Sequence, residues 1–132
     1  MRGVSLLFIA ATLAGCSTAP DQPRSVQAED QLGRALAGKV ALAPVACLPS
    51  LRAGDMTVID DGTILFRHGR TVYRNDLDGG RCTGLGGGNA LLTRQHGQLC
   101  RGEIAEVVNL NTGTTIGSCV LGDFVPYTTA GG

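Results

Sequence analysis

The 132-residue sequence has no tryptophan, only two tyrosines and three phenylalanines, and no excess of either charge. Eleven basic side chains balance eleven acidic ones, whereas proteins that bind nucleic acid usually carry a clear basic excess. Sugar-binding surfaces commonly stack the sugar on aromatic rings. These two shortages argue against a nucleic-acid-binding protein and weaken the case for a carbohydrate-binding one.

Motifs for catalysis and for metal binding are also missing. The segment Gly117-Ser118-Cys119 lacks the Gly-x-Ser-x-Gly pattern of a nucleophile elbow, and no Cys-x-x-Cys pair occurs. His68 and His96 are isolated, and lone histidines in turns are commoner than catalytic ones. Residues 84–89 and 76–80 resemble a phosphate loop and a calcium loop but lack the required Lys-Ser/Thr and glutamate. We therefore expect no enzyme activity, no metal and no cofactor.

The longest mostly apolar run, residues 4–13, is broken only by Ser5 and Thr12 and follows Arg2 near the N-terminus. It is about half the ~20 residues that a membrane-spanning helix needs. A basic start, a short apolar core and small residues at its end are typical of a secretion signal. The run ends in Leu13-Ala14-Gly15-Cys16, so a cysteine stands where such a signal is cut.

This ending resembles the lipobox of bacterial lipoproteins. In that family the cysteine thiol receives a diacylglycerol, the chain is cut before it, and the new amino group is acylated, commonly with palmitate. The resemblance makes residues 1–15 a signal peptide and places the lipid on Cys16. Each buried methylene contributes ~0.8 kcal/mol, so several acyl chains anchor a protein firmly without a membrane-spanning helix. Ser17 follows in place of the aspartate that retains lipoproteins in the inner membrane, which favours the periplasmic face of the outer membrane.

Four cysteines remain once Cys16 carries lipid: Cys47, Cys82, Cys100 and Cys119. An even number of cysteines in an oxidising compartment predicts two disulfides, and four cysteines allow three pairings. We favour Cys82–Cys100, which would close a glycine-rich loop. The other bond would then be Cys47–Cys119, which would tie the start of the domain to its last strand.

Removing the first 15 of the 132 residues leaves 117, enough for one domain with its own core. Residues 16–24 contain two prolines and no apolar run, and we expect a tether there. Residues 25–127 form the expected domain, and 128–132 a disordered tail. The domain would begin with a helix at 25–38, because Ser25 can cap its start and Gly38 can end it.

The rest of the domain reads as short strands joined by turns. Asp61-Gly62 and His68-Gly69 separate three apolar runs and predict hairpins, in which the glycine supplies a positive φ. Asn111-Thr112-Gly113 predicts a further hairpin, and residues 123–127 an edge strand in which Pro126 is tolerated. About seven such strands predict a mainly β fold, a small antiparallel meander forming a barrel or a sandwich.

Arginines gather around the predicted hairpins. Arg67, Arg70 and Arg74 are the candidate partner-binding residues, with Arg81 nearby, and they would suit an acidic partner such as lipid A phosphates or an acidic protein. The alternative is a solvated sheet face that neighbouring aspartates neutralise.

Three segments, DGTILFRHGRTVYRN, LCRGEIAEVVNL and GSCVLGDFVPY, are similar to a family of small bacterial envelope proteins described as a domain of unknown function. The resemblance covers residues 45–127 and implies a single envelope domain without assigning a mechanism. The sequence therefore predicts an outer-membrane-anchored periplasmic lipoprotein, a non-enzymatic binding or structural module whose partner is an unidentified envelope protein. The alternative is a protein like the lysozyme inhibitors, which would block an enzyme cleft with the loop at residues 84–89.

Overall fold

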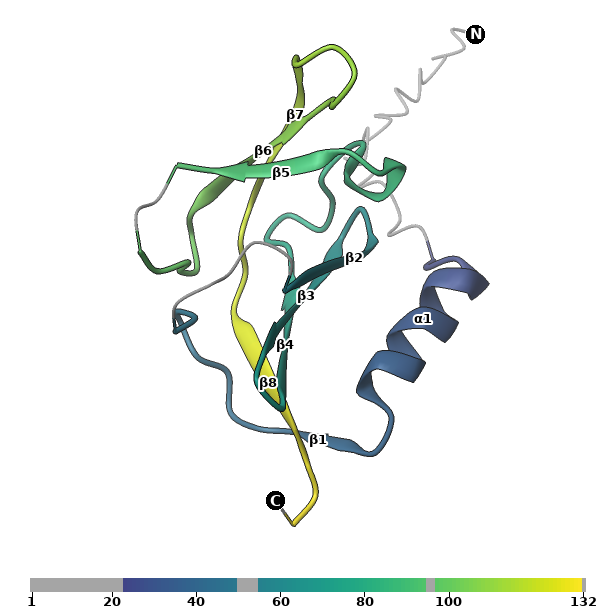
Figure 1. The fold of residues 1–132 in the computed structure, drawn as a ribbon, viewed down its shortest axis with the longest axis vertical. Helices are drawn as coiled ribbons and strands as arrows, with labels where there is room; N and C mark the ends of the chain where they lie inside the picture. The colour runs from purple at the N-terminus through teal and green to yellow at the C-terminus, as the bar shows by residue number, and fades with distance from the viewer. Residues whose placement is uncertain (1–22, 50–54, 95–96, 132) are drawn as a thin grey trace, which may run out of the picture.

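The computed structural model describes residues 23–49, 55–94 and 97–131. Within these ranges the chain forms one α-helix, one short 3-10 helix and eight strands in two antiparallel sheets (Figure 1). The predicted signal peptide, Cys16 and His96 lie outside the described residues.

Helix α1 spans Val26–Leu36, as the sequence predicts. The side chain of Ser25 caps it by accepting a hydrogen bond of 3.2 Å from the backbone N–H of Ala28. Gly38 then adopts a φ of +69° and turns the chain away from the helix axis. In the described part of the chain, no helix has the length and apolar character needed to cross a membrane.

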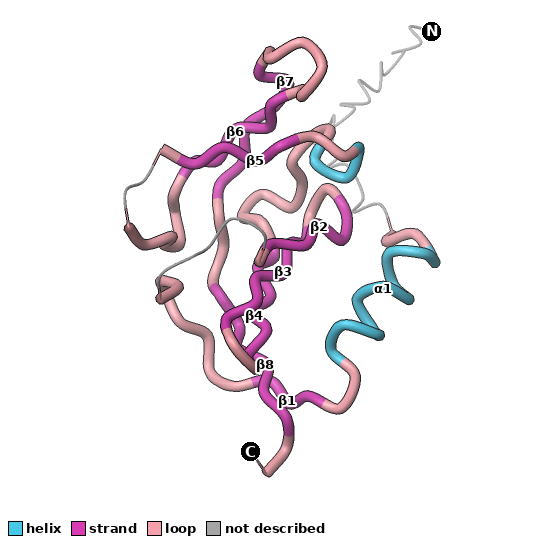
Figure 2. Tube along the Cα trace, in the orientation of Figure 1, coloured by secondary structure: helices cyan, strands magenta, loops and turns pink. Residues whose placement is uncertain are grey.

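The larger sheet contains five strands in the order β1-β8-β4-β3-β2 (Figure 2). Their bounds are β1 Lys39–Ala41, β2 Met56–Asp60, β3 Thr63–His68, β4 Thr71–Asp76 and β8 Phe124–Thr129. Strands β2, β3 and β4 form the predicted meander. Successive strand residues face opposite sides of a sheet, so Leu65 packs under α1 with Leu32, while Ile64 and Phe66 face the main core.

The smaller sheet contains β5 Ala90–Thr93, β6 Ile104–Val108 and β7 Thr115–Val120, in the order β5-β6-β7. Its buried residues Ala105 and Val107 share one core with Ile64 and Phe124 of the larger sheet. Across the described residues the two sheets stay open instead of closing into a barrel, so the fold corresponds to the sandwich alternative of the prediction.

The disulfides are Cys47–Cys100 and Cys82–Cys119, so both predicted pairings are wrong. Cys47 and Cys100 lie directly opposite each other in an antiparallel bridge, with their Cα atoms 4.0 Å apart. The N–H of Cys82 donates to the carbonyl of Asp61 at 2.6 Å, which holds the glycine-rich segment in the core next to β7 and Cys119. Tertiary contacts of this kind are not visible in the spacing of cysteines.

Strand β8 also differs from the prediction, because it lies inside the sheet between β1 and β4 instead of at an edge. Pro126 is tolerated for a local reason. Its carbonyl accepts a hydrogen bond of 2.8 Å from Leu42, the residue after the end of β1. The N and C=O of a strand residue point to the same side of the strand. The side of Pro126 that lacks an N–H therefore also faces Leu42, which lies beyond the last residue of β1. The strand continues to Thr129, which pairs with Lys39, so residues 128 and 129 of the predicted tail belong to the larger sheet.

Candidate functional site

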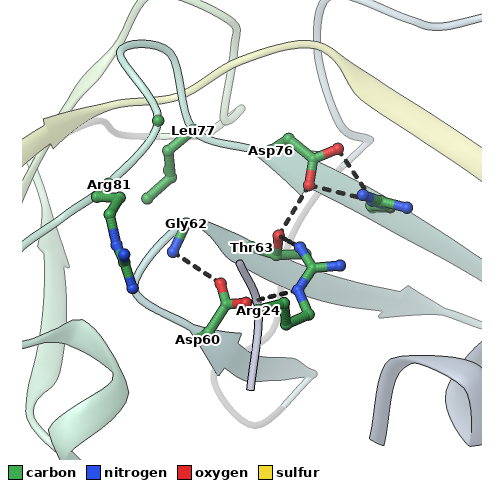
Figure 3. A pocket seen from close by; sticks show the side chains of 9 residues that line it. Arg24, Asp60, Gly62, Thr63, Asp76, Leu77 and Arg81 are labelled. Carbon is green, nitrogen blue, oxygen red and sulfur yellow. Dashed lines mark hydrogen bonds and ion pairs between the residues drawn. The ribbon is translucent and has the colours of Figure 1, made fainter. Parts of the chain in front are cut away.

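A hollow of about 280 Å³ lies where the start of α1 meets the β2–β3 turn (Figure 3). Three arginines, Arg24, Arg74 and Arg81, and two aspartates, Asp60 and Asp76, provide the charged groups of its lining. We call this hollow the Arg24 pocket.

Arg24, the residue before the helix cap Ser25, connects the start of α1 to two strands. Its Nε donates to Asp60 Oδ2 at 2.6 Å, and its Nη2 donates to the Thr63 hydroxyl at 2.5 Å. The Thr63 hydroxyl in turn donates to Asp76 Oδ1 at 2.8 Å. These three bonds, drawn in Figure 3, hold the start of the helix against β2 and β3.

The protonation states of this pair follow from its contacts. Burial disfavours the charge on Asp60, but hydrogen bonds from Arg24 and from the backbone of Gly62, together with the nearby guanidinium, lower the pKa of the carboxyl. Burial likewise opposes the charge on Arg24, while the hydrogen bond and attraction to Asp60 raise the pKa of the guanidinium. Both groups are therefore charged at neutral pH and form a salt bridge.

The sequence prediction placed Arg24 in the tether and missed this role. The one available signal is its position: Arg24 is the only cation between Arg2 and Arg34 and directly precedes the cap residue Ser25. Which carboxylate it would meet depends on the packing of α1 against β2, and a sequence pattern does not specify that contact.

Gly62 lies in the β2–β3 turn, as predicted, but not with the predicted positive φ. A Cβ at this position would collide with the carbonyl oxygen of Gly80, so glycine is required by close backbone approach.

Arg74, one of the three candidate partner-binding residues, is engaged within the domain. Its Nε lies 2.9 Å from Asp76 Oδ2, and its side chain lines the Arg24 pocket. Arg74 thus lines a different hollow from Arg67 and Arg70, and its role in partner binding stays a prediction.

Arg67 and Arg70 remain together at the opposite end of α1. With Lys39 they line a hollow of about 210 Å³ whose other lining residues are Gly69, Val72 and Thr129. We call Lys39, Arg67 and Arg70 the basic end. Lys39 Nζ donates to the Arg70 carbonyl at 3.2 Å, and the β3–β4 turn that carries Arg70 depends on Gly69, whose φ is +60°.

The basic end differs from the Arg24 pocket in its charge balance. None of its lining residues is acidic. Within the described residues, its three cations form no ion pair, whereas Arg24, Arg74, Arg94 and Arg101 each do. These three cationic side chains come from β1, β3 and the β3–β4 turn and line one hollow. Such an arrangement is suited to bind an anion.

The glycine-rich loop at residues 84–89 packs against its own domain. It contains the 3-10 helix η1, Leu85–Gly87, in which Leu85 is only 1% exposed. Gly86 N–H donates to Asp61 Oδ1 at 2.6 Å, and Asn89 Nδ2 donates to the Gly84 carbonyl at 2.7 Å. This arrangement gives no support to the inhibitor alternative, which needs a loop that enters a cleft.

The remaining candidate groups do not assemble. His68 is exposed at the end of β3. Asp60 and Asp61 bind different partners, Arg24 and Gly86 respectively. In the described ranges, no three His, Cys, Asp or Glu side chains group as metal ligands would.

No protein-family model matches the chain, and comparisons with curated proteins and with solved structures gave no match. The features that bear on function are therefore the predicted lipid-attachment sequence ending at Cys16, the two disulfides and the two charged hollows.

Proposed function

We propose that the protein is a lipoprotein of the bacterial cell envelope, of the small-protein family that its sequence resembles. Its lipid, on Cys16, would hold it on the periplasmic face of the outer membrane. The observation that carries this proposal is Leu13-Ala14-Gly15-Cys16 at the end of a short apolar run after Arg2. The two disulfides support it, because disulfides form and persist in oxidising compartments such as the periplasm.

The domain would act as a non-enzymatic binding module. Arg24 is eight residues from Cys16, and a fully extended chain spans at most ~3.6 Å per residue, so the Arg24 pocket lies within about 29 Å of the lipid. Arg24 is fixed to Asp60 and Thr63, so the attachment point belongs to the folded domain. The basic end, at the other end of α1, is the surface we assign to an acidic partner, with Lys39 in place of the predicted Arg74.

Expression of the full chain in a Gram-negative host tests both parts of this proposal. Wild type should fractionate with outer membranes, and Cys16→Ala should lose the lipid and leave the membrane fraction. Ser17→Ala is the matched control, because it keeps the cysteine and should remain membrane-bound. Equal membrane association of Cys16→Ala and wild type would contradict the anchoring.

The partner is tested in the same cells by crosslinking. Wild type should capture an envelope component that the double variant Arg67→Glu/Arg70→Glu no longer captures. Arg94→Glu is the matched control, because Arg94 is 80% exposed but lies beside the smaller sheet, paired with Glu106. Capture that is unchanged by the double variant would contradict the assignment of the basic end.

A further inference from the structure

We propose that the hollow at the basic end binds a terminal phosphate group, either free phosphate or the phosphate of a monoester. This inference deepens the proposed function, on which it rests, by naming the chemistry of the acidic partner. It depends on the charge, the geometry and the size of the hollow lined by Lys39, Arg67 and Arg70.

The charge of the hollow favours a ligand that carries more than one negative charge. Its lining contributes three cations and no carboxylate. Arg67 also lines a second, adjoining hollow, to which Asp55 contributes a carboxylate. In the described part of the chain, no ion pair within 4 Å joins Arg67 to Asp55. A phosphomonoester carries about −1.5 to −2 at neutral pH, and a carboxylate carries only −1.

The geometry also favours a phosphate. The two guanidinium groups come from β3 and from the β3–β4 turn, and the ammonium group comes from β1. Guanidinium groups bind phosphate oxygens in pairs, and a terminal phosphate offers three such oxygens. Thr129 and Gly69 also line the hollow, and neither of them is charged. The side chains of Lys39, Arg67 and Arg70 could therefore each donate to one of the three terminal phosphate oxygens.

The size of the hollow limits the ligand to a small group. Pockets for drug-sized molecules typically measure about 300–1,000 Å³, and this one measures about 210 Å³. It would take the phosphate and leave the rest of the ligand outside. The same phosphate chemistry is available from free phosphate or from a lipid headgroup, and the experiment distinguishes the two.

The first arm titrates the purified full chain, in detergent, with inorganic phosphate at constant ionic strength and follows the heat of binding. Arg67→Gln and Arg70→Gln should each weaken binding about tenfold. Arg94→Gln should not change it. Acetate, which presents a carboxylate, should bind more weakly than phosphate. Unfolding curves of each variant confirm that the domain is folded.

The second arm inserts the full chain in phosphatidylcholine nanodiscs with or without phosphatidic acid and measures amide hydrogen exchange of residues 67–72. Protection that requires phosphatidic acid would identify a lipid phosphate as the source, and binding in the first arm alone would identify free phosphate. Absence of phosphate binding in both arms would overturn the inference, as would affinity unchanged by Arg67→Gln and Arg70→Gln or equal affinity for acetate. A chain without lipid on Cys16 would overturn the anchoring but would leave the phosphate titration unchanged.

Discussion

Arg24 is the residue that joins the segment before α1 to the larger sheet. Its bonds to Asp60 and Thr63 depend on two residues 36 and 39 positions away. No local pattern predicts such a contact, which explains why the sequence assigned Arg24 to the tether. Arg74 differs, because its partner Asp76 lies two positions further along β4 and on the same face of the strand, so this ion pair is a local contact.

The salt bridge predicts a specific dependence of stability on pH. Because the pKa of Asp60 is lowered in the folded protein, its stabilising effect is complete above the unfolded pKa of about 3.9 and is lost as the pH falls through the lower folded value. Asp60→Asn should reduce the free energy of unfolding at pH 7 by about 1–3 kcal/mol. The difference from wild type should shrink below about pH 4.

Urea unfolding at a series of pH values between 7 and 3 measures this difference. Asp78→Asn is the matched control, because Asp78 is exposed and its substitution should leave stability nearly unchanged at every pH. A difference between Asp60→Asn and wild type that stays constant or grows in acid would show that the salt bridge does not act as described.

Two glycines provide opposite predictions from the same substitution. A Cβ on Gly122 would overlap the carbonyl oxygen of Asp76, and the Gly122 backbone is held by the fully buried Asn75. Gly122→Ala should therefore destabilise the domain by about 1–3 kcal/mol. Gly33 lies within α1 with open space around it, so Gly33→Ala should stabilise the domain by up to about 1 kcal/mol. Thermal unfolding compares them, and a stabilising Gly122→Ala would contradict the packing at β7–β8.

Elements defined by neighbouring residues were predictable, and elements defined by distant contacts were not. The cap at Ser25 and the turns at Asp61-Gly62 and His68-Gly69 are local signals, so the helix and the meander are confirmed. The position of β8 depends on β1, which pairs with it across 129 − 39 = 90 positions of the chain (Lys39 with Thr129). Pro126 predicted an edge strand because the end of β1 beside it is not visible in the sequence.

The disulfides give the clearest test at the level of elements. Digestion without reduction should yield one linked pair of peptides containing Cys47 and Cys100 and another containing Cys82 and Cys119. Replacing Cys47 and Cys100 together by alanine should cost about 4 kcal/mol, because the bond joins residues 53 positions apart. A linked peptide pair containing Cys82 and Cys100 would contradict the arrangement of the two sheets.

At the scale of the whole molecule, the two charged hollows lie at opposite ends of α1. The Arg24 pocket adjoins the start of the helix, and Lys39 of the basic end follows its last residue by three positions. The 11 residues of the helix correspond to about 16 Å at 1.5 Å per residue. We propose that one end of the domain attaches to the lipid anchor and that the other end meets the acidic partner.

The mass of the N-terminal peptide of the protein purified from membranes tests whether Cys16 carries lipid. We predict that the mature chain begins at Cys16 and that this residue carries a diacylglycerol on its thiol and an acyl chain on its amino group. A chain that retains residues 1–15, or a Cys16 with a free thiol, would contradict the lipoprotein assignment.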